Sequence, residues 1–591
     1  QIMGTWEYDS FGQLKKSVSG GFCYTYEYRP DGKLLNKWSS GRKVLSCTYY
    51  RDGSLKSQTD MSGKTLYYAY DGDGRLKCLK EGKGRDNIGN PDDNSAITLT
   101  EYSYTAAGRI KEIITKSGIR TSYAYDEDGN ISRLTIGDGT AEGLLYDAFM
   151  LYDLNGNRTG KTGSRLDIGG KQAEMAVSYR YDSMNRLTNE DRNGTGERYA
   201  YDLCGNRLLK EQYSGSCVDA TEGYRYNERN ELTERIKAGN LTTYRYDKNG
   251  SIISEEEEGR RSEYRYDLLN RQTYIRTLDG KEQENSYDGE GLRAGLTENG
   301  KKTTFLYHSG EILTECDGES APIRRHIRGI RLSCVQSIHD NAYHSYHQDE
   351  QGSTAYITGQ ENAVENCYRY DAFGNLIEQK ATIENCILYT GQQYDQETGQ
   401  YYLRARYYNP VVGRFLQEDT YRGDGLNLYA YCANNPVVYY DPSGHGKKSQ
   451  PLCGTGSNSD LDDTVGNNAN QPKYEVSESR RDHILEGDPP GTGHGPNRGN
   501  TEGAFPDTWT DDQSINAIER VANSPDSTWK QSTGPGHVTA PVTRGGPDPN
   551  APSTTNNGSP VRYKVDGRDH GLDIEVIVEP NGEGIITGYV K

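Results

Sequence analysis

A short motif recurs along the first two thirds of the chain: Tyr-x-Tyr-Asp, then two or three residues, then Gly or Asn, and soon afterwards an apolar residue. Clear copies begin at Tyr68, Tyr123, Tyr179, Tyr199, Tyr244 and Tyr368. In neighbouring copies the second tyrosines stand 20 residues apart, as Tyr226, Tyr246 and Tyr266 do. A fixed period of this kind predicts a repeat architecture, which constrains the fold more than any other feature of the sequence.

Each repeat is expected to form a β-hairpin. The Tyr-x-Tyr alternation is typical of a strand, the Asp and the Gly-Asn pair suit a tight turn, and the apolar residue starts the second strand. A single hairpin cannot bury its own face, so the hairpins are expected to join into continuous sheets. We therefore predict a mostly β structure for residues 1–390, in which the repeated Tyr and Asp serve packing and turns, not catalysis.

Composition supports a packed but polar protein. The 591 residues are only 32% hydrophobic and the mean hydropathy is −0.93, yet 48 tyrosines can bury large ring areas while keeping a polar tip. The formal net charge of −18 disfavours passive binding of the whole surface to nucleic acid or to anionic membranes.

The cysteines and histidines do not show metal-site spacing. The eleven cysteines are scattered and form no CxxC pair, which argues against a disulfide framework or a structural zinc site and favours buried free thiols. Five histidines fall within residues 305–350 without ligand spacing, so no metal and no cofactor is expected.

No apolar run reaches the ~18 residues of a membrane helix, and no signal pattern opens the chain. Because the chain begins within a repeat, we expect it to be the C-terminal part of a longer protein whose export signal lies upstream.

Residues 391–446 keep the tyrosines but lose the 20-residue period. Two aspartates, Asp419 and Asp441, could act together, since a carboxyl kept protonated by a neighbouring carboxylate can serve as acid while the other activates water. A turn at Asp441-Pro442 and a loop cap at Asp419 are the alternative roles, and the residues alone leave both open.

A composition change after Gly446 marks a domain boundary. Residues 447–478 are rich in Gly, Ser, Asn and Asp and are predicted to be a linker, and residues 479–591 are predicted to form a small α+β domain with a helix over SINAIERVAN. In this domain His483 and His494 flank a glycine-rich turn. Two imidazoles could take a proton from a ribose 2′-OH and protonate the leaving 5′-oxygen; a metal pair or simple surface histidines are the alternatives.

The repeats resemble the YD repeats of the Rhs and teneurin class, which implies that the sheets of residues 1–390 spiral into a hollow cocoon. Residues 391–446 resemble the Rhs-core associated segment, notably in Arg406-Tyr407-Tyr408-Asn409-Pro410 and Asp441-Pro442-Ser443-Gly444. This second resemblance implies self-cleavage after Gly444 by Asp419 and Asp441. His445 stands where the family often has an apolar residue.

Residues 481–591 resemble the bacterial EndoU nucleases through His-Ile-Leu-x-Gly-Asp, Gly-x-Gly-His, Phe-Pro-x-x-Trp and Ile-Ile-Thr-x-Tyr. The resemblance implies a metal-independent endoribonuclease that leaves a 2′,3′-cyclic phosphate, with His494 as base and His483 as acid. Thr587 and Tyr589 would then hold the ribose and the base.

Two departures from the EndoU pattern stand out. The family's lysine, expected beside Phe505-Pro506, is replaced by Asp507-Thr508, so the third catalytic group would be Lys530 or Lys564, with Arg498 a further substitute. Residues 447–591 also hold 13 Lys and Arg against 21 Asp and Glu, a net charge of −8 that is unfavourable for RNA unless the cations cluster.

Together the resemblances imply an exported toxin whose shell encloses and then releases an RNase into the cytoplasm of a competing cell. They imply an RNA substrate, such as tRNA, a cognate immunity protein and components of a delivery system, with no stable membrane insertion of these residues. Two rival hypotheses remain: a YD-repeat surface or adhesion protein with a non-catalytic C-terminal binding module, and a toxin with a different nuclease chemistry.

Overall fold

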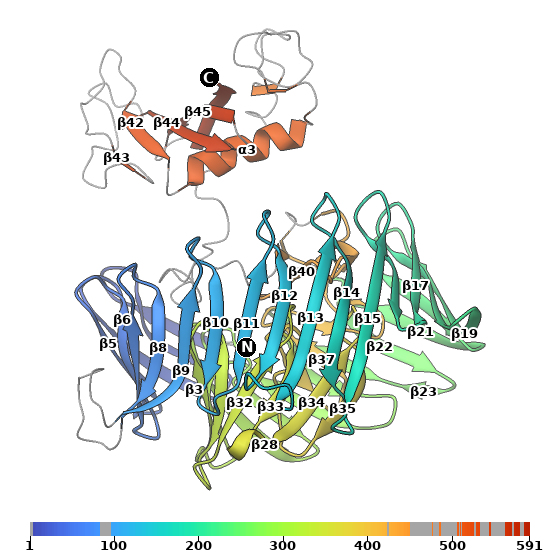
Figure 1. Cartoon of the computed structure of the whole chain (residues 1–591), viewed down its shortest axis with the longest axis horizontal. Helices are drawn as coiled ribbons and strands as arrows, with labels where there is room; N and C mark the ends of the chain where they lie inside the picture. Colours follow the sequence, from blue (N-terminus) through green and yellow to red (C-terminus); the bar gives the residue numbers. More distant parts are fainter. Residues whose placement is uncertain are drawn as a thin grey trace. The chain divides into compact units, whose positions relative to one another are not determined.

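The computed structural model describes residues 4–82, 96–421 and 425–449 of the N-terminal part. In the C-terminal part it describes residues 476, 484–485, 505–506, 509, 511–524, 527–531, 543–544, 562–569, 572–579 and 584–591. The chain divides into two compact units, Gln1–Val465 and Gly466–Lys591, and Figure 1 shows the elements of both.

The first unit begins with a 23-stranded antiparallel sheet in which each strand pairs with the next along the chain. Its strands are β1 (Gly4–Tyr8), β2 (Leu14–Ser19), β3 (Phe22–Tyr28), β4 (Leu34–Ser39), β5 (Arg42–Tyr49), β6 (Leu55–Asp60), β7 (Thr65–Tyr70), β8 (Leu76–Glu81), β9 (Ile97–Tyr104), β10 (Ile110–Thr115), β11 (Arg120–Tyr125), β12 (Ile131–Gly137), β13 (Leu144–Tyr152), β14 (Arg158–Leu166), β15 (Gln172–Tyr181), β16 (Leu187–Arg192), β17 (Thr195–Tyr201), β18 (Arg207–Ser214), β19 (Cys217–Tyr226), β20 (Leu232–Lys237), β21 (Asn240–Tyr246), β22 (Ile252–Glu257) and β23 (Arg260–Arg261).

A second antiparallel sheet of 12 strands follows, again paired in chain order. Its strands are β24 (Glu263–Tyr266), β25 (Gln272–Arg276), β26 (Glu282–Ser286), β27 (Gly295–Glu298), β28 (Lys301–His308), β29 (Glu311–Cys316), β30 (Pro322–Arg328), β31 (Leu332–Ser337), β32 (Tyr343–Gln348), β33 (Thr354–Thr358), β34 (Val364–Tyr370) and β35 (Leu376–Ala381). A 3₁₀ turn, η1 (Gln360–Asn362), joins β33 to β34.

The repeated motif forms the predicted hairpin turns. In one of them Asp182 Oδ1 accepts hydrogen bonds from the backbone N–H groups of Met184 and Arg186, each at 2.9 Å. Asn185 in the same turn has a φ of 59°, a conformation that Asn and Gly adopt readily. The sequence prediction of Asp-initiated hairpins is therefore confirmed.

The two tyrosines of the motif have different roles. The first ring is buried, as in Tyr199. The hydroxyl of the second tyrosine donates a hydrogen bond to a backbone carbonyl oxygen of the preceding hairpin. Tyr201, for example, donates to the carbonyl oxygen of Leu187 at 2.8 Å. The same bond recurs along both sheets, for example from Tyr28, Tyr49, Tyr70, Tyr104, Tyr125, Tyr152 and Tyr266. Tyrosine is required at this position because phenylalanine could not make the bond, and the bond ties each hairpin to its neighbour.

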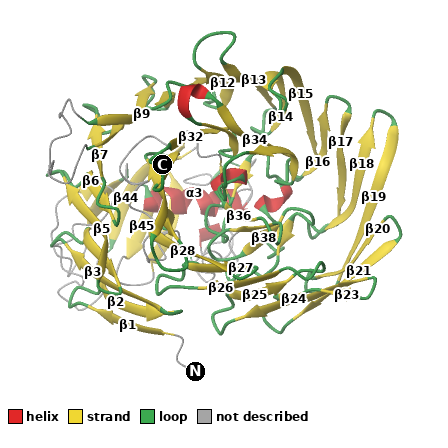
Figure 2. Cartoon of the chain, turned by 90° about the horizontal axis from the view of Figure 1, so that it is seen from below, coloured by secondary structure: helices red, strands yellow, loops and turns green. Residues whose placement is uncertain are grey.

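Buried charged contacts join the two sheets. Glu290 accepts from Lys37 at 2.5 Å, and Glu350 accepts from Arg158 at 3.0 Å, across 253 and 192 residues of chain. Arg325 of β30 likewise binds both Asp60 and Glu81 of the first sheet. Because a buried charge is costly unless it is paired, such contacts fix how the sheets meet. Figure 2 shows the strands of the first sheet around the periphery, with β32 and β34 nearer the middle.

Residues 391–446 add short elements to this unit. They include η3 (Cys432–Asn434), preceded by η2 (Tyr389–Gly391), and the strands β36 (Gln393–Asp395), β37 (Gln400–Tyr402), β38 (Tyr407–Asn409), β39 (Arg414–Phe415) and β40 (Tyr439–Tyr440). Tyr408 stacks on Tyr431 with ring centroids 4.1 Å apart, and both rings are buried in a core shared with β28 and β33. Beyond Gly446, β41 (Lys448–Ser449) pairs with β40.

The second unit contains a five-stranded antiparallel sheet in the order β43-β42-β44-β45-β46 with α3 (Asp511–Asn523) packed on one face (Figure 1). The strands are β42 (Thr528–Gln531), β43 (Thr543–Arg544), β44 (Tyr563–Asp569), β45 (Leu572–Glu579) and β46 (Gly584–Val590). Ile518 of α3 and Val565 and Val576 of the sheet are fully buried. The α+β fold and the helix over SINAIERVAN agree with the sequence.

The ten described cysteines are all free. Cys204 and Cys217 are exposed, contrary to the expectation of burial; Cys204 lies in a hairpin turn and Cys217 is the first residue of β19. Cys453 lies outside the described residues. No helix within the described ranges has the length and apolarity needed to span a membrane.

Candidate active sites

The two aspartates predicted to cleave the chain meet around one arginine. Arg406 lies in the loop before β38, Asp419 follows β39, and Asp441 follows β40. The Nη2 atom of Arg406 is 2.6 Å from Asp419 Oδ2 and 3.8 Å from Asp441 Oδ2. All three side chains are buried, so these charges interact with little screening by water.

Gly444, the predicted cleavage position, is held in the same place. Its N–H donates to Asp441 Oδ1 at 2.8 Å, and Arg406 Nε donates to its carbonyl oxygen. Its φ is +80°, and an added Cβ would lie 2.5 Å from the Leu403 carbonyl oxygen and 2.9 Å from the Arg406 nitrogen. Only glycine fits here, because the Cβ of any other residue would clash with both of these backbone atoms.

The two carboxyls have different surroundings. Burial raises the pKa of Asp441, and the charge of Arg406 only partly opposes this effect. Asp419 pairs directly with Arg406 and also lies 3.0 Å from His445 Nδ1. Asp441 therefore favours its protonated form, while Asp419 is held by a cation. An acid–base pair needs this combination.

The sequence motif included Arg406 but gave it no role. The signal that could have identified it is an arginine directly before the tyrosines Tyr407 and Tyr408, because a cation buried with them requires anionic partners. The guanidinium also lies over the Phe415 ring at 3.6 Å, which fixes its plane.

The C-terminal unit brings four predicted residues to one face of its sheet. Lys530 lies opposite Lys564 across β42 and β44, and Thr587 and Tyr589 lie opposite Ile577 and Glu575 across β45 and β46. Since directly opposed residues point to the same side, these side chains share the face turned away from α3.

The other face of this sheet is closed by packing. Gly588 lies between Thr587 and Tyr589, and a Cβ there would be 2.7 Å from Cγ1 of Ile518. The glycine therefore allows α3 to approach the sheet closely, while its two neighbours stay on the open polar face.

His483 and His494, the predicted acid and base, lie outside the described residues, as do Arg498 and Asp507-Thr508. Their position relative to Thr587 and Tyr589 stays a prediction. Among the described residues, no group of three His, Cys, Asp or Glu side chains is arranged to hold a metal ion.

Glu575 is a residue of the polar face that the sequence analysis missed. Its carboxylate accepts from Tyr589 Oη at 2.5 Å and Lys564 Nζ at 2.8 Å, and Lys591 Nζ lies 3.2 Å away. Burial opposes its ionisation, but these bonds outweigh burial and lower the pKa of Glu575 to about 2. Burial and the bond to Glu575 raise the pKa of Tyr589 to about 12. The available signal was a carboxylate flanked by Ile574 and Val576 near the middle of the strand Leu572–Glu579.

Lys530 and Lys564 differ in their partners. Lys564 is bound to Glu575, whereas no ion pair of Lys530 occurs among the residues whose structure is described. Two lysines directly opposite each other on a sheet repel, and a bound anion would relieve this repulsion.

Residues 150–437 match the Teneurin YD-shell family, and residues 98–141 match the RHS Repeat family. A crystal structure of TcdB2-TccC3-Cdc42 superposes on 75% of this chain and 25% of its own, with a TM-score of 0.56 at 17% identity. The first unit is therefore a β-shell of the YD-repeat, or Rhs, type, as the repeats predicted.

Three curated relatives carry toxin or nuclease names. The tRNA3(Ser)-specific nuclease WapA of Bacillus spizizenii is 31% identical over 366 residues, which are 58% of this chain and 14% of WapA. Toxin protein Tse5 of Pseudomonas aeruginosa is 25% identical over 59% of this chain and 29% of its own length. The probable deoxyribonuclease RhsA of Dickeya dadantii is 25% identical over 66% of this chain and 30% of its own. The matches thus span less than a third of each relative.

Proposed function

We propose that the chain is an Rhs-type toxin that cuts itself after Gly444 and thereby frees residues 445–591, a nuclease. The observation that carries the first step is the contact of Arg406 with Asp419, Asp441 and the Gly444 carbonyl. The toxin and nuclease names of the relatives support the second step.

In the proposed cleavage, Asp419 takes a proton from water, whose oxygen attacks the carbonyl carbon of Gly444. Arg406 stabilises the negative charge that develops on the carbonyl oxygen. Asp441 gives its proton to the nitrogen of His445 as the peptide bond breaks. The products are a new carboxyl at Gly444 and a new amine at His445.

The test is electrophoresis of the purified chain with Asp419→Asn and Asp441→Asn. The wild type is expected to give two bands, and each variant one band at 66.1 kDa. Asp128→Asn, at an exposed hairpin turn, is the matched control and should cleave normally. Cleavage of both active-site variants at the wild-type rate would contradict the proposal.

For the nuclease we propose EndoU-like chemistry, in which His494 deprotonates the ribose 2′-OH and His483 protonates the leaving 5′-oxygen. The polar face with Lys530, Thr587 and Tyr589 would bind the substrate, and its opposed lysines suit a phosphate. The proposed substrate is RNA, such as tRNA, in the cytoplasm of a competing cell. A cognate immunity protein and a delivery system are the proposed partners.

Incubating the self-cleaved protein with RNA in excess chelator tests this chemistry. Cyclic-phosphate ends are expected, and His483→Ala and His494→Ala should abolish them. His537→Ala, at a histidine outside the EndoU-like motifs, is the control and should not. A strict metal requirement with cleavage of DNA would instead favour the second candidate, a deoxyribonuclease, which the name of RhsA from Dickeya dadantii suggests.

A further inference from the structure

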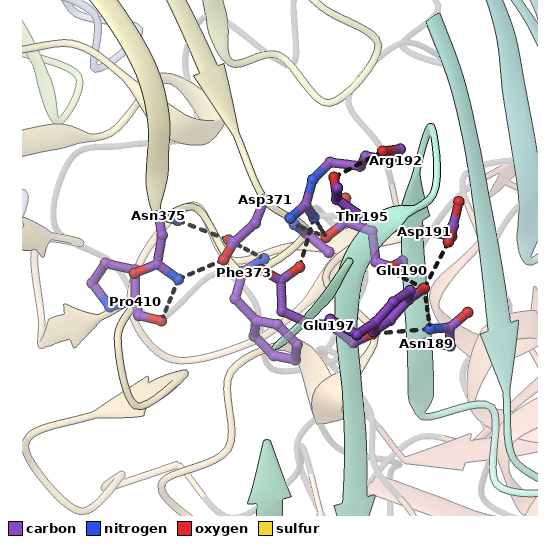
Figure 3. Close-up of polar contacts among 12 residues, drawn as sticks. Asn189, Glu190, Asp191, Arg192, Thr195, Glu197, Asp371, Phe373, Asn375 and Pro410 are labelled. Atoms are coloured by element: carbon purple, nitrogen blue, oxygen red, sulfur yellow. Dashed lines mark hydrogen bonds and ion pairs between the residues drawn. The ribbon is translucent and has the colours of Figure 1, made fainter. Parts of the chain in front are cut away.

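A cavity of about 70 Å³ lies in the first unit where β33 and β34 pack against β14–β16. Its charged lining residues are the four cations Lys161, Arg165, Arg192 and Arg369 and the three carboxylates Glu190, Asp349 and Asp371, and the remaining lining includes several tyrosines. Figure 3 shows three of these lining residues, Glu190 and Arg192 of β16 and Asp371, which directly follows β34. The cavity therefore lies in the seam between the two sheets.

Three of its four cations are paired with carboxylates. Arg192 Nη1 is 2.7 Å from Glu190 and 2.7 Å from Glu197 (Figure 3). Lys161 Nζ is 2.8 Å from Glu350. Arg369 Nη1 is 2.5 Å from Glu378. The lining carboxylates Asp349 and Asp371 accept hydrogen bonds from backbone N–H groups of their own turns.

Arg165 is the exception. It is only 8% exposed, and its Nε and Nη1 atoms are buried and have no hydrogen-bond partner in the protein. Burial, followed by the charge of Arg369, lowers the pKa of Arg165, but a guanidinium stays protonated at any physiological pH. Burying a cation with unbonded N–H donors costs free energy unless an anion or a water molecule accepts hydrogen bonds from them.

We propose that this cavity binds one small inorganic oxyanion, such as phosphate or sulfate, on the guanidinium of Arg165. The fork of Arg N–H groups matches two oxygens of such an ion. A cavity of about 70 Å³ has room for a small ion or a few water molecules. Because Arg165 belongs to β14 and Arg369 to β34, the ion would also weaken the repulsion between these two cations across the seam.

Calorimetric titration of the full chain with inorganic phosphate, at constant ionic strength, tests this proposal. Saturable binding of one ion is expected, together with a thermal unfolding midpoint that rises with phosphate and, in parallel, with sulfate. Arg165→Met should lose both effects, and Arg165→Lys, which keeps the charge but not the fork, should bind at least tenfold more weakly.

Arg198→Met is the matched control, since Arg198 is half exposed on β17 and pairs with Glu211. It should bind phosphate as the wild type does. The proposal is wrong if the wild type shows no saturable binding, if Arg165→Met binds equally well, or if chloride raises the midpoint as much as phosphate. The first result would mean that water hydrates the guanidinium, and the third would mean that the stabilisation is a general effect of salt.

Discussion

The Nε atom of Arg406 donates a hydrogen bond to the carbonyl oxygen of Gly444, 38 residues further along the chain. The same guanidinium contacts Asp419 and Asp441, so one buried cation serves a peptide carbonyl and two carboxylates. This is the place from which an arginine would stabilise the charge of a tetrahedral intermediate at that peptide bond.

Replacing Arg406 with lysine should slow self-cleavage about 100-fold, because an ammonium cannot donate in a fixed fork to Gly444 and Asp419 together. Timed electrophoresis after synthesis measures the rate. Arg404→Lys is the control, since Arg404 binds Gly310 and Glu311 instead and should leave cleavage unchanged. Equal rates for Arg406→Lys and the wild type would remove the arginine from the mechanism.

Gly444→Ala should both block cleavage and destabilise the segment by roughly 1–3 kcal/mol, because alanine is strained at a φ of +80° and its Cβ would meet backbone. The cleavage assay and the unfolding midpoint measure the two effects. In Gly446→Ala the nearest atom to the new Cβ is 4.0 Å away, so this neighbour should tolerate the change. Full cleavage of Gly444→Ala would show that the tight backbone is not needed.

Glu575→Gln should weaken the C-terminal unit by about 1.5–3 kcal/mol at pH 7, since Lys564, Lys591 and Tyr589 lose a charged acceptor. The lowered pKa of about 2 means that this stability is fully present above the ordinary pKa of 4.5 and is lost as pH falls towards 2. The free energies of unfolding of the variant and the wild type, measured between pH 7 and pH 3, should therefore converge at the acidic end. A constant difference across that range would contradict the assignment.

Glu190→Gln should change how the stability of the first unit depends on pH between pH 5 and pH 8. Burial is the main cause that raises the pKa of Glu190 to about 7, against the charge of Arg192. A raised carboxyl pKa gives stability that is present below about 4.5 and is lost as pH rises through 7. The wild-type midpoint, followed by near-ultraviolet circular dichroism, should therefore fall between pH 5 and pH 8, and the fall should be smaller in Glu190→Gln. Exposed Glu228→Gln should behave as the wild type.

The hairpins were predictable because their information is local: one Tyr-x-Tyr-Asp motif determines a strand, a turn and the next strand. The pairing of Glu350 with Arg158 was not predictable, because it joins residues 192 apart and depends on how two sheets close on each other. The motif around Gly444 identified Asp419 and Asp441 through resemblance, but only the structure shows that Arg406 connects them.

In the C-terminal unit, alternation along the final strands was enough to predict β45 and β46. The face shared by Lys530 and Tyr589 required the strand order, in which β42 pairs not only with β43, the strand that follows it, but also with β44. Glu575 was missed because a charge inside an apolar strand is explained only when its cross-strand neighbours Tyr589 and Lys564 are known.

The N-terminal sequence of the smaller fragment, determined on purified wild type and on Asp441→Asn, tests the central claim most directly. The wild type should yield a fragment that begins at His445, with the sequence His-Gly-Lys-Lys, and Asp441→Asn should yield only the 66.1 kDa chain. An uncut wild-type chain, or a fragment with the same new end in both proteins, would contradict self-cleavage by this site.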